Sequence, residues 1–368
     1  MITITNDLLP INPAYNDSII EFETTATGTT SASITIDGKV FKVYGINNKY
    51  SYNFKNNVTV LINENKFKDA IVPNLYTSSI YDDSTLSYQL PVTIAIDGYS
   101  AETVTKNYKF LKNVEQLIDN KLKSSANNSV RILLPTNNYT DYNLPYFEGY
   151  PIDFSVYGIS SGSTFYLKNT SSISTSDMYS SISNSTKRIF ISDGANNEYL
   201  SNLIGLTNTV NKLELWVNNT FNSNLNIKRF DSKSGVYLKW FNASGSYSYW
   251  LFDDVVTETI TTNTLDEING DYDNIQNVSS TSQITGKKAN KTLKLSTKFS
   301  EFEKDYLTSI LTSPMVEMYI YDKPFQQIQT NSFIGVSLND SSTSFNNKTG
   351  NYQMNLTITL PYYNTQTL

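Results

Sequence analysis

The sequence predicts a mainly β protein made of several β-sandwich modules, with a few short helices and an α+β module at the C-terminal end. Three observations carry this prediction: short segments alternate apolar and polar residues, turn signals such as Asp-Gly separate them, and 27 tyrosines accompany 18 phenylalanines. A chain of 368 residues exceeds one ordinary domain. We therefore expect three modules, over residues 1–123, 124–230 and 231–368.

The first module, residues 1–123, is expected to be a β-sandwich closed by a helix. Its strands alternate apolar and polar residues, and Asp37-Gly38 and Asp97-Gly98 each follow such a strand, which favours type I′ hairpin turns. Residues 63–72, before Pro73, are expected to form one or two helical turns. Apolar residues at helical spacing predict an amphipathic helix over 110–122.

The middle module, residues 124–230, reads as strands joined by long polar loops. The strand candidates are residues 131–134, 152–157, 164–167, 188–191 and 212–217. Residues 169–186 consist almost entirely of Ser, Thr, Ile and Asn, which is typical of either a mobile tip or a β edge that orders in an assembly.

The C-terminal module, residues 231–368, combines strands with one helix. An aromatic hairpin spans residues 236–252, a strand begins near residue 253, and a polar loop is expected from 261 to 283 before a strand at 292–297. Ser300 and Glu303 form a capping box that should start a helix, which Pro314 ends. The closing strands are expected at 315–321 and 351–360, with a turn at 346–350.

The aromatic hairpin supplies the candidate site residues. It contains two of the three tryptophans of the chain. We expect its large side chains to anchor a core or an interface, and the alternative is a platform on which sugar rings stack. The five candidates are Trp240, Tyr247, Tyr249, Trp250 and Phe252.

The composition excludes several kinds of catalysis. With no cysteine and no histidine, the chain has no Ser-His-Asp triad, no Cys-His dyad and no histidine-based zinc site. Paired carboxylates remain, but the adjacent pairs Asp82-Asp83 and Asp253-Asp254 should point to opposite faces of their strands. The cluster Asp266, Glu267, Asp271 and Asp273 lacks the residue order of an EF-hand and is interpreted as a solvated loop. We therefore expect no enzyme, catalytic residue, cofactor or metal site.

Charge and hydropathy limit the classes of partner that the chain can bind. Charged residues make up 17% of the chain and the net charge is −6, which does not suit nucleic-acid binding. No run of eighteen apolar residues is present, so we expect no membrane span. Residues 1–7 lack the features of a secretory signal.

Three segments resemble tail structural proteins of phages that infect Bacteroidetes, the crAss-like phages among them. The first is the hairpin from Lys239 to Phe252, with its tryptophans and central glycine. The second is Asn12-Pro13-Ala14-Tyr15-Asn16 leading into strands, and the third is the closing segment from Leu307 to Val316. The resemblance covers about half of the chain, and residues 130–230 match no family we can name.

The resemblance implies a structural component of a phage virion tail: a hub, ring, distal-tail-like or adaptor protein that is assembled in the host cytoplasm. Its partners would be copies of itself in a symmetric ring and other phage tail proteins. One alternative is a receptor-binding or fibre protein that recognises host surface glycans. The other is a polysaccharide depolymerase, which would need two converging carboxylates in a groove.

Overall fold

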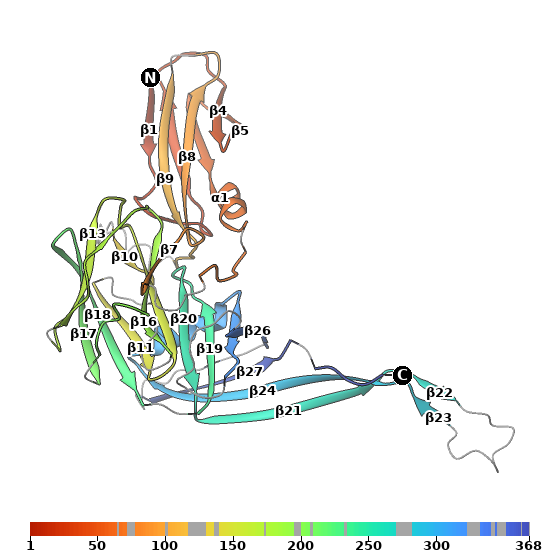
Figure 1. Ribbon diagram of the computed structural model, residues 1–368. Helices are drawn as coiled ribbons and strands as arrows, with labels where there is room; N and C mark the ends of the chain where they lie inside the picture. Colours follow the sequence, from red (N-terminus) through yellow and green to blue (C-terminus); the bar gives the residue numbers. More distant parts are fainter. Residues whose placement is uncertain are drawn as a thin grey trace, which may run out of the picture.

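The computed structural model describes residues 1–64, 66–71, 78–99, 102–116, 130–135, 140–172, 174–194, 200–206, 209–231, 234–269, 282–321, 332–339, 343, 351–361 and 363–367. The protein is mainly β, with 57% strand and 6% helix, in several packed sheets. This confirms the predicted fold class. Figure 1 shows an upright N-terminal sandwich, a larger body beneath it and a long β-arm that projects from the body.

The N-terminal sandwich packs a three-stranded sheet against a five-stranded sheet. The first has the order β1 (Ile2–Asn6), β3 (Ile19–Thr24), β6 (Lys49–Asn53). The second has the order β2 (Asn12–Pro13), β9 (Thr103–Leu111), β8 (Ser87–Ile96), β4 (Ser31–Ile36), β5 (Lys39–Tyr44). Alternate residues of these strands face one shared core that includes Phe22, Ile34 and Ile94. Helix α1 (Lys55–Ile62) adds Val58 and Ile62 to that core.

The larger body contains three further sheets. A four-stranded sheet has the order β10 (Arg131–Ile132), β12 (Pro151–Tyr157), β16 (Thr186–Asp193), β7 (Ile80–Asp83). A six-stranded sheet has the order β11 (Asp141–Phe147), β18 (Thr220–Phe230), β17 (Val210–Val217), β13 (Thr164–Asn169), β14 (Ser174–Thr175), and β15 (Tyr179–Ser180) also pairs with β13.

The third sheet of the body is seven-stranded. Its order is β20 (Tyr247–Phe252), β19 (Val236–Phe241), β25 (Val316–Tyr319), β26 (Phe333–Leu338), β27 (Asn351–Thr359), β24 (Lys287–Ser300), β21 (Val255–Thr264). One hydrophobic core joins side chains of the middle and C-terminal segments, from Leu144 and Phe154 to Trp240 and Leu356. The boundary at residues 230 and 231 stays a prediction.

The long arm is the outer part of this seven-stranded sheet. Strands β21 and β24 pair antiparallel over ten consecutive residue pairs, from Val255–Ser296 to Thr264–Lys287, without a register shift. Two short strands, β22 (Glu267–Asn269) and β23 (Ser282–Ile284), continue the hairpin, and the C-terminal end lies beside it (Figure 1). The polar loop predicted for 261–283 is therefore wrong in its described parts, which are mostly strand.

Two helix predictions in the first module are wrong. Phe110 and Leu111 end strand β9, and residues 112–116 are not helical, because the preceding residues are held in a sheet ladder with β8. Residues 117–122 lie outside the described residues. The helical turns predicted for 63–72 are also misplaced. The helix is α1, which ends at Ile62 where its apolar face meets the sandwich core, and residues 65 and 72 lie outside the described residues.

The C-terminal helix begins later than the capping box predicts. Ser300 remains the last residue of β24, and α3 (Lys304–Thr308) follows, continued by the 3₁₀ helix η2 (Ser309–Thr312). The capping contact itself forms, because the Ser300 backbone N–H donates to Glu303 Oε2 at 2.8 Å. The ladder with β27 extends to Ser300 and delays the start of the helix.

Most of the strand predictions are confirmed. The Trp hairpin, the five strands of the middle module and the closing strands all form. Part of the low-complexity segment pairs with β13 as β14 and β15. The Asp37-Gly38 turn has positive φ at both residues, as type I′ requires, whereas β8 and β9 are joined by a longer loop. Strand β26 was not predicted, and the turn expected at 346–350 lies outside the described residues.

Candidate interaction surfaces

The Trp hairpin is buried in the centre of the body. Trp240 and Trp250 are 0% and 2% exposed, and Tyr247, Tyr249 and Phe252 are buried as well. The indole Nε1–H of Trp240 donates to Ser309 Oγ at 2.8 Å, which ties β19 to helix η2. Trp250 Nε1–H donates to Thr297 Oγ1 at 2.9 Å. These rings hold a core together, and a sugar cannot reach their faces.

A charge cluster lies buried beside this hairpin. The Arg188 guanidinium makes a two-point contact with the Asp153 carboxylate, at 2.8 Å from Nε and 2.9 Å from Nη2. Its Nη1 also donates to Asp69 at 2.5 Å. Lys239, on strand β19, bridges Asp69 at 3.1 Å and Glu317 at 2.6 Å. The cluster links four sheet strands, β12, β16, β19 and β25, to the segment after α1, so it fixes how these parts meet.

The electrostatics of the cluster favour its charged form. Burial by itself lowers the pKa of Arg188, but the Asp153 and Asp69 carboxylates raise that pKa well above its ordinary value. Burial raises the pKa of Asp69, and the charges of Arg188 and Lys239 outweigh it and bring the pKa to about 2. The Arg188 guanidinium also lies 4.5 Å from the ring centroid of Tyr247. This is the chemistry of a structural ion network.

The carboxylates singled out by sequence do not converge. Asp266 and Glu267 are exposed near the end of the arm, and Asp271 and Asp273 lie outside the described residues. Lys187 pairs with Asp82, the buried Asp83 lies 3.7 Å from Arg188 Nη1, and Lys298 pairs with Asp254 at 3.0 Å. Among the described residues, no group of three or more acidic side chains is arranged to hold a metal ion.

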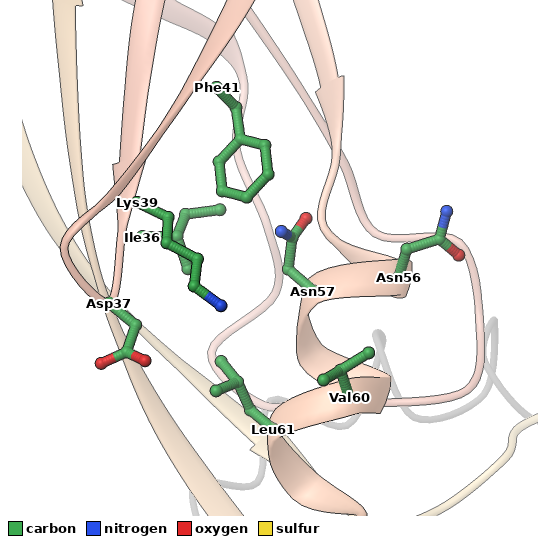
Figure 2. A pocket seen from close by; sticks show the side chains of 8 residues that line it. All are labelled: Ile36, Asp37, Lys39, Phe41, Asn56, Asn57, Val60 and Leu61. Atoms are coloured by element: carbon green, nitrogen blue, oxygen red, sulfur yellow. The ribbon is translucent and has the colours of Figure 1, made fainter.

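A hollow opens in the N-terminal sandwich between the β4–β5 hairpin and helix α1. Its volume is about 260 Å³. Figure 2 shows Phe41 and Lys39 on the strand side and Asn57, Val60 and Leu61 on the helix side. The lining is mostly apolar, with amide and charged groups at its rim. Tyr52 O–H donates to Asn57 Oδ1 at 2.8 Å and so fixes the orientation of that amide.

A second hollow, of about 280 Å³, lies where the N-terminal sandwich meets the body. Aromatic rings of Tyr15, Phe67 and Phe241 line it together with Lys112. The ammonium of Lys112 lies 4.5 Å from the centroid of the Phe67 ring and donates to the Lys66 carbonyl. Burial lowers the pKa of Lys112 to about 8. This hollow is a seam between modules whose walls come from five separate segments.

An aromatic row lies on the six-stranded sheet. Tyr166 and Trp216 are cross-strand partners whose rings stack with a 6.1 Å separation of their centroids, and Phe221 meets Trp216 edge-on. Trp216 Nε1–H donates to Glu214 at 3.0 Å. Phe221 is 44% exposed, and the other two rings are half-buried. The sequence does not single out Trp216, because it stands alone in an ordinary alternating strand.

The most exposed element is the outer strand of the arm. All ten residues of β21 are exposed, and the strand is the last in its sheet, with β24 on one side. Val256 and Ile260 keep 45% and 44% of their surface exposed. The only charged residue in the strand is Glu258, which pairs with Lys291 at 2.7 Å. An edge strand of this length without proline, bulge or several charges is unprotected against pairing with another chain.

In the part of the chain that the structure describes, no helix has the length and apolarity needed to cross a membrane.

Comparisons with known proteins identify no family for this chain. No protein-family model matches it, and no curated protein matches it. Solved structures give distant likenesses, such as a titin Ig tandem with a TM-score of 0.23, 7% identity and coverage of 62% of this chain and 97% of that one. Fibronectin(III)-like modules of CbhA from Clostridium thermocellum give a TM-score of 0.17 at 8% identity, covering 63% and 95% of the two chains. The extracellular region of plexin A4 gives 0.21 at 10% identity, and the match covers 62% of this chain and 24% of the plexin chain. At these TM-scores the likenesses carry no argument about function.

Proposed function

We propose that this chain is a structural component of a phage virion tail, in a hub, ring, distal-tail-like or adaptor position. It would act without catalysis, by assembling with copies of itself in a symmetric ring and by docking neighbouring tail proteins. The assignment to a phage tail rests on the sequence resemblance of the Trp hairpin and of the two end segments.

The observation that supports assembly is the projecting arm. Its outer strand β21 is exposed at every residue, and its backbone edge is open within the described part of the chain. A monomer gains nothing from holding Val256 and Ile260 in water along this ladder, whereas an assembly would bury them. The buried aromatic core and ion network, in turn, give the body the rigidity that a repeated building block needs.

Two measurements test this function. Mass photometry of the purified chain across a concentration series should show discrete oligomers, and electron microscopy of virions labelled through this chain should place it on the tail. A chain that stays monomeric at all concentrations, or a label found only on capsids or on no particle, would refute the proposal.

A second candidate function is recognition of host surface glycans, and the row Tyr166, Trp216 and Phe221 favours it. Aromatic faces beside a carboxylate suit the apolar and hydroxyl faces of a sugar ring, and Glu214 is hydrogen-bonded to Trp216. Glycan-array binding that is lost in Trp216→Ala and kept in Trp216→Phe would support this candidate. Binding that is the same in all three proteins, or absent from the unaltered chain, would reject it.

A further inference from the structure

Within the residues that the structure describes, two strands present open edges that complement each other. One is β21 on the arm, and the other is β5, the last strand of the five-stranded sheet in the N-terminal sandwich. On β5, Val40 and Tyr44 are 61% and 77% exposed, and the Lys42 side chain is exposed as well. Two such edges from different copies can join into one continuous sheet if their backbone groups and side chains match.

The hydrogen-bond pattern of the arm shows which residues of β21 face the open edge. Leu265 N–H donates to the Gly286 carbonyl at 3.0 Å, one step beyond the last ladder pair, Thr264–Lys287. On the other side of β24, Leu360 N–H donates to the Lys291 carbonyl at 3.0 Å. Because antiparallel pairing alternates, both bonds imply that odd-numbered residues of β21 bond to β24. The even-numbered residues, from Val256 to Thr264, therefore direct N–H and C=O to the open edge.

The same reasoning applies to β5. Gly45 N–H donates to the Thr30 carbonyl at 3.1 Å, which continues the ladder that pairs Ser31 with Tyr44. Odd-numbered residues of β5 thus bond to β4, and Val40, Lys42 and Tyr44 direct their backbone groups outward. Hydrogen-bonded pairs between the two edges must join an even-numbered residue of β5 to an even-numbered residue of β21.

One antiparallel register satisfies both edges and matches the side chains. It places Val40 opposite Ile260, Lys42 opposite Glu258 and Tyr44 opposite Val256. Directly opposed residues lie on the same face of the sheet, so apolar meets apolar on both sides of a central ion pair. Lys42 already lies 3.5 Å from Asp97, and Glu258 lies 2.7 Å from Lys291. The joined sheet would carry charges of alternating sign, from Asp97 next to the end of β8, through Lys42 and Glu258, to Lys291 on β24.

We propose that the arm strand β21 of one copy adds to the edge of β5 in a second copy, with Lys42 opposite Glu258. This deepens the proposed function and rests on its self-assembly component. The contact joins two different surfaces of the chain, so repetition gives a ring where the rotation closes and a filament where it does not. The opposing pairing of β21 with β21, related by a twofold axis, would bring Ile260 against Ile260 and would give only closed pairs.

Because the chain has no cysteine, disulfide trapping can read this register directly. Opposed residues of a hydrogen-bonded antiparallel pair have Cα atoms about 5.5 Å apart, within disulfide range. Proteins carrying Val40→Cys and Ile260→Cys, mixed under mild oxidation, should give a disulfide-linked dimer in high yield. The matched control replaces Ile260→Cys with Val256→Cys, which lies about 13 Å away along the strand and should give little product.

The outcomes separate the alternatives. Equal yields from the two mixtures would overturn the register. Efficient dimers from Ile260→Cys alone would overturn the contact with β5 and identify twofold pairing of the arms.

A double-mutant cycle tests the ion pair without a cross-link. Lys42→Gln and Glu258→Gln should each weaken association by about fivefold in sedimentation velocity, and the double variant should weaken it no further, because both changes remove one contact. Multiplicative losses would overturn the pairing of these two residues. Both side chains are exposed, so the fold should survive in every variant.

These experiments also distinguish this inference from the proposed function. If the unaltered chain forms rings but neither trapping nor the cycle links β5 to β21, the strand pairing fails and the assembly role stands. If the unaltered chain remains monomeric, both fail together.

Discussion

Two hairpins that are neighbours in the chain end in opposite environments. The first, β19–β20, is rich in aromatic residues, and every residue of β20 is buried. The second begins two residues later with β21, which is rich in threonine, and every residue of β21 is exposed. Both are regular antiparallel ladders. Regular pairing alone therefore does not decide where a hairpin lies. The side chains decide where a hairpin lies, because only the Trp hairpin can offset the loss of backbone and side-chain entropy by burying large rings.

We infer that the two hairpins have different roles. The Trp hairpin contributes to stability through packing and through Lys239 in the ion network. The arm contributes little to the stability of a monomer, and under the proposed function its open edge would receive a partner. Four predictions follow this contrast, from the largest effect on folding to the smallest.

The largest loss is expected for Trp240→Ala. Trp240 is fully buried and its indole donates to Ser309, so the substitution should lower the free energy of unfolding by about 3–5 kcal/mol. Chemical denaturation followed by circular dichroism measures it. Trp216→Ala is the matched control, because Trp216 is only half-buried, and it should cost less than half as much. Equal losses would remove the contrast between core and surface tryptophan.

A loss of similar size is expected when the ion network is broken at its centre. Arg188→Met removes the cation that contacts Asp153 and Asp69; Asp69 keeps Lys239, but the buried Asp153 carboxylate loses its cation. We expect a loss of about 3–5 kcal/mol in the free energy of unfolding. Arg229→Met is the control, because Arg229 forms a partly exposed pair with Glu148 and should lose less than about 1 kcal/mol. A stable Arg188→Met protein would show that packing, and not charge, holds this region.

A smaller effect is expected from acid. The pKa of Asp69 is about 2 in the folded protein, below its ordinary 3.8, so folding favours the ionised carboxylate. Its contribution is complete above the ordinary pKa and is lost as the pH falls from about 4 through 2, amounting to about 2 kcal/mol. Unfolding free energies measured between pH 5 and 2 should fall less steeply in Asp69→Asn. Parallel pH profiles for the two proteins would contradict this.

The smallest effect on folding is expected on the arm. Ile260→Asp should change the free energy of unfolding by less than about 0.5 kcal/mol, because the side chain is already largely in water. It should nevertheless abolish oligomers in mass photometry. A variant that still assembles would exclude the arm edge from the contact, and one that unfolds would show that the arm supports the body.

Part of the fold could be predicted from sequence because the signals are local. Residues 152–156 of β12 alternate apolar and polar side chains, and the Trp hairpin is two aromatic strands around a short Asn/Ser/Gly turn. Asp37-Gly38 specifies a tight turn through its backbone angles. Strands are predicted for residues 253–260 and 292–297, within or beside β21 and β24. The outer part of the arm is not predicted, because Thr261 to Thr264 carry no apolar alternation and because the pairing with β24 comes from far along the chain. The predicted helix at 110–122 failed in its described part for the same reason. The ladder with β8 overrides helical spacing at Phe110 and Leu111.

The candidate site residues also show that local sequence signals do not report long-range contacts. Aromatic content singled out Trp240 and Trp250, but it could not tell a core from a surface. The ion network joins Asp69, Asp153, Arg188 and Lys239 from four distant segments, and no spacing along the chain signals that meeting. The edge of β21 also has no motif. Its signal is the scarcity of charge in a strand whose outer edge no described residue covers.

Because β24 lies between β21 and β27, the strands of the arm must pair in a fixed order while the chain is synthesised. When residue 300 leaves the ribosome, β21 and β24 can form only a two-stranded ribbon, which is marginal in water. The nine pairs with Asn351–Thr359 come some fifty residues later. At usual elongation rates this is a delay of seconds, far longer than hairpin closure. A nascent chain therefore cannot display a firm arm until the body that carries it is almost complete. Under the proposed assembly, this delay would keep unfinished chains from capturing one another on the same polysome.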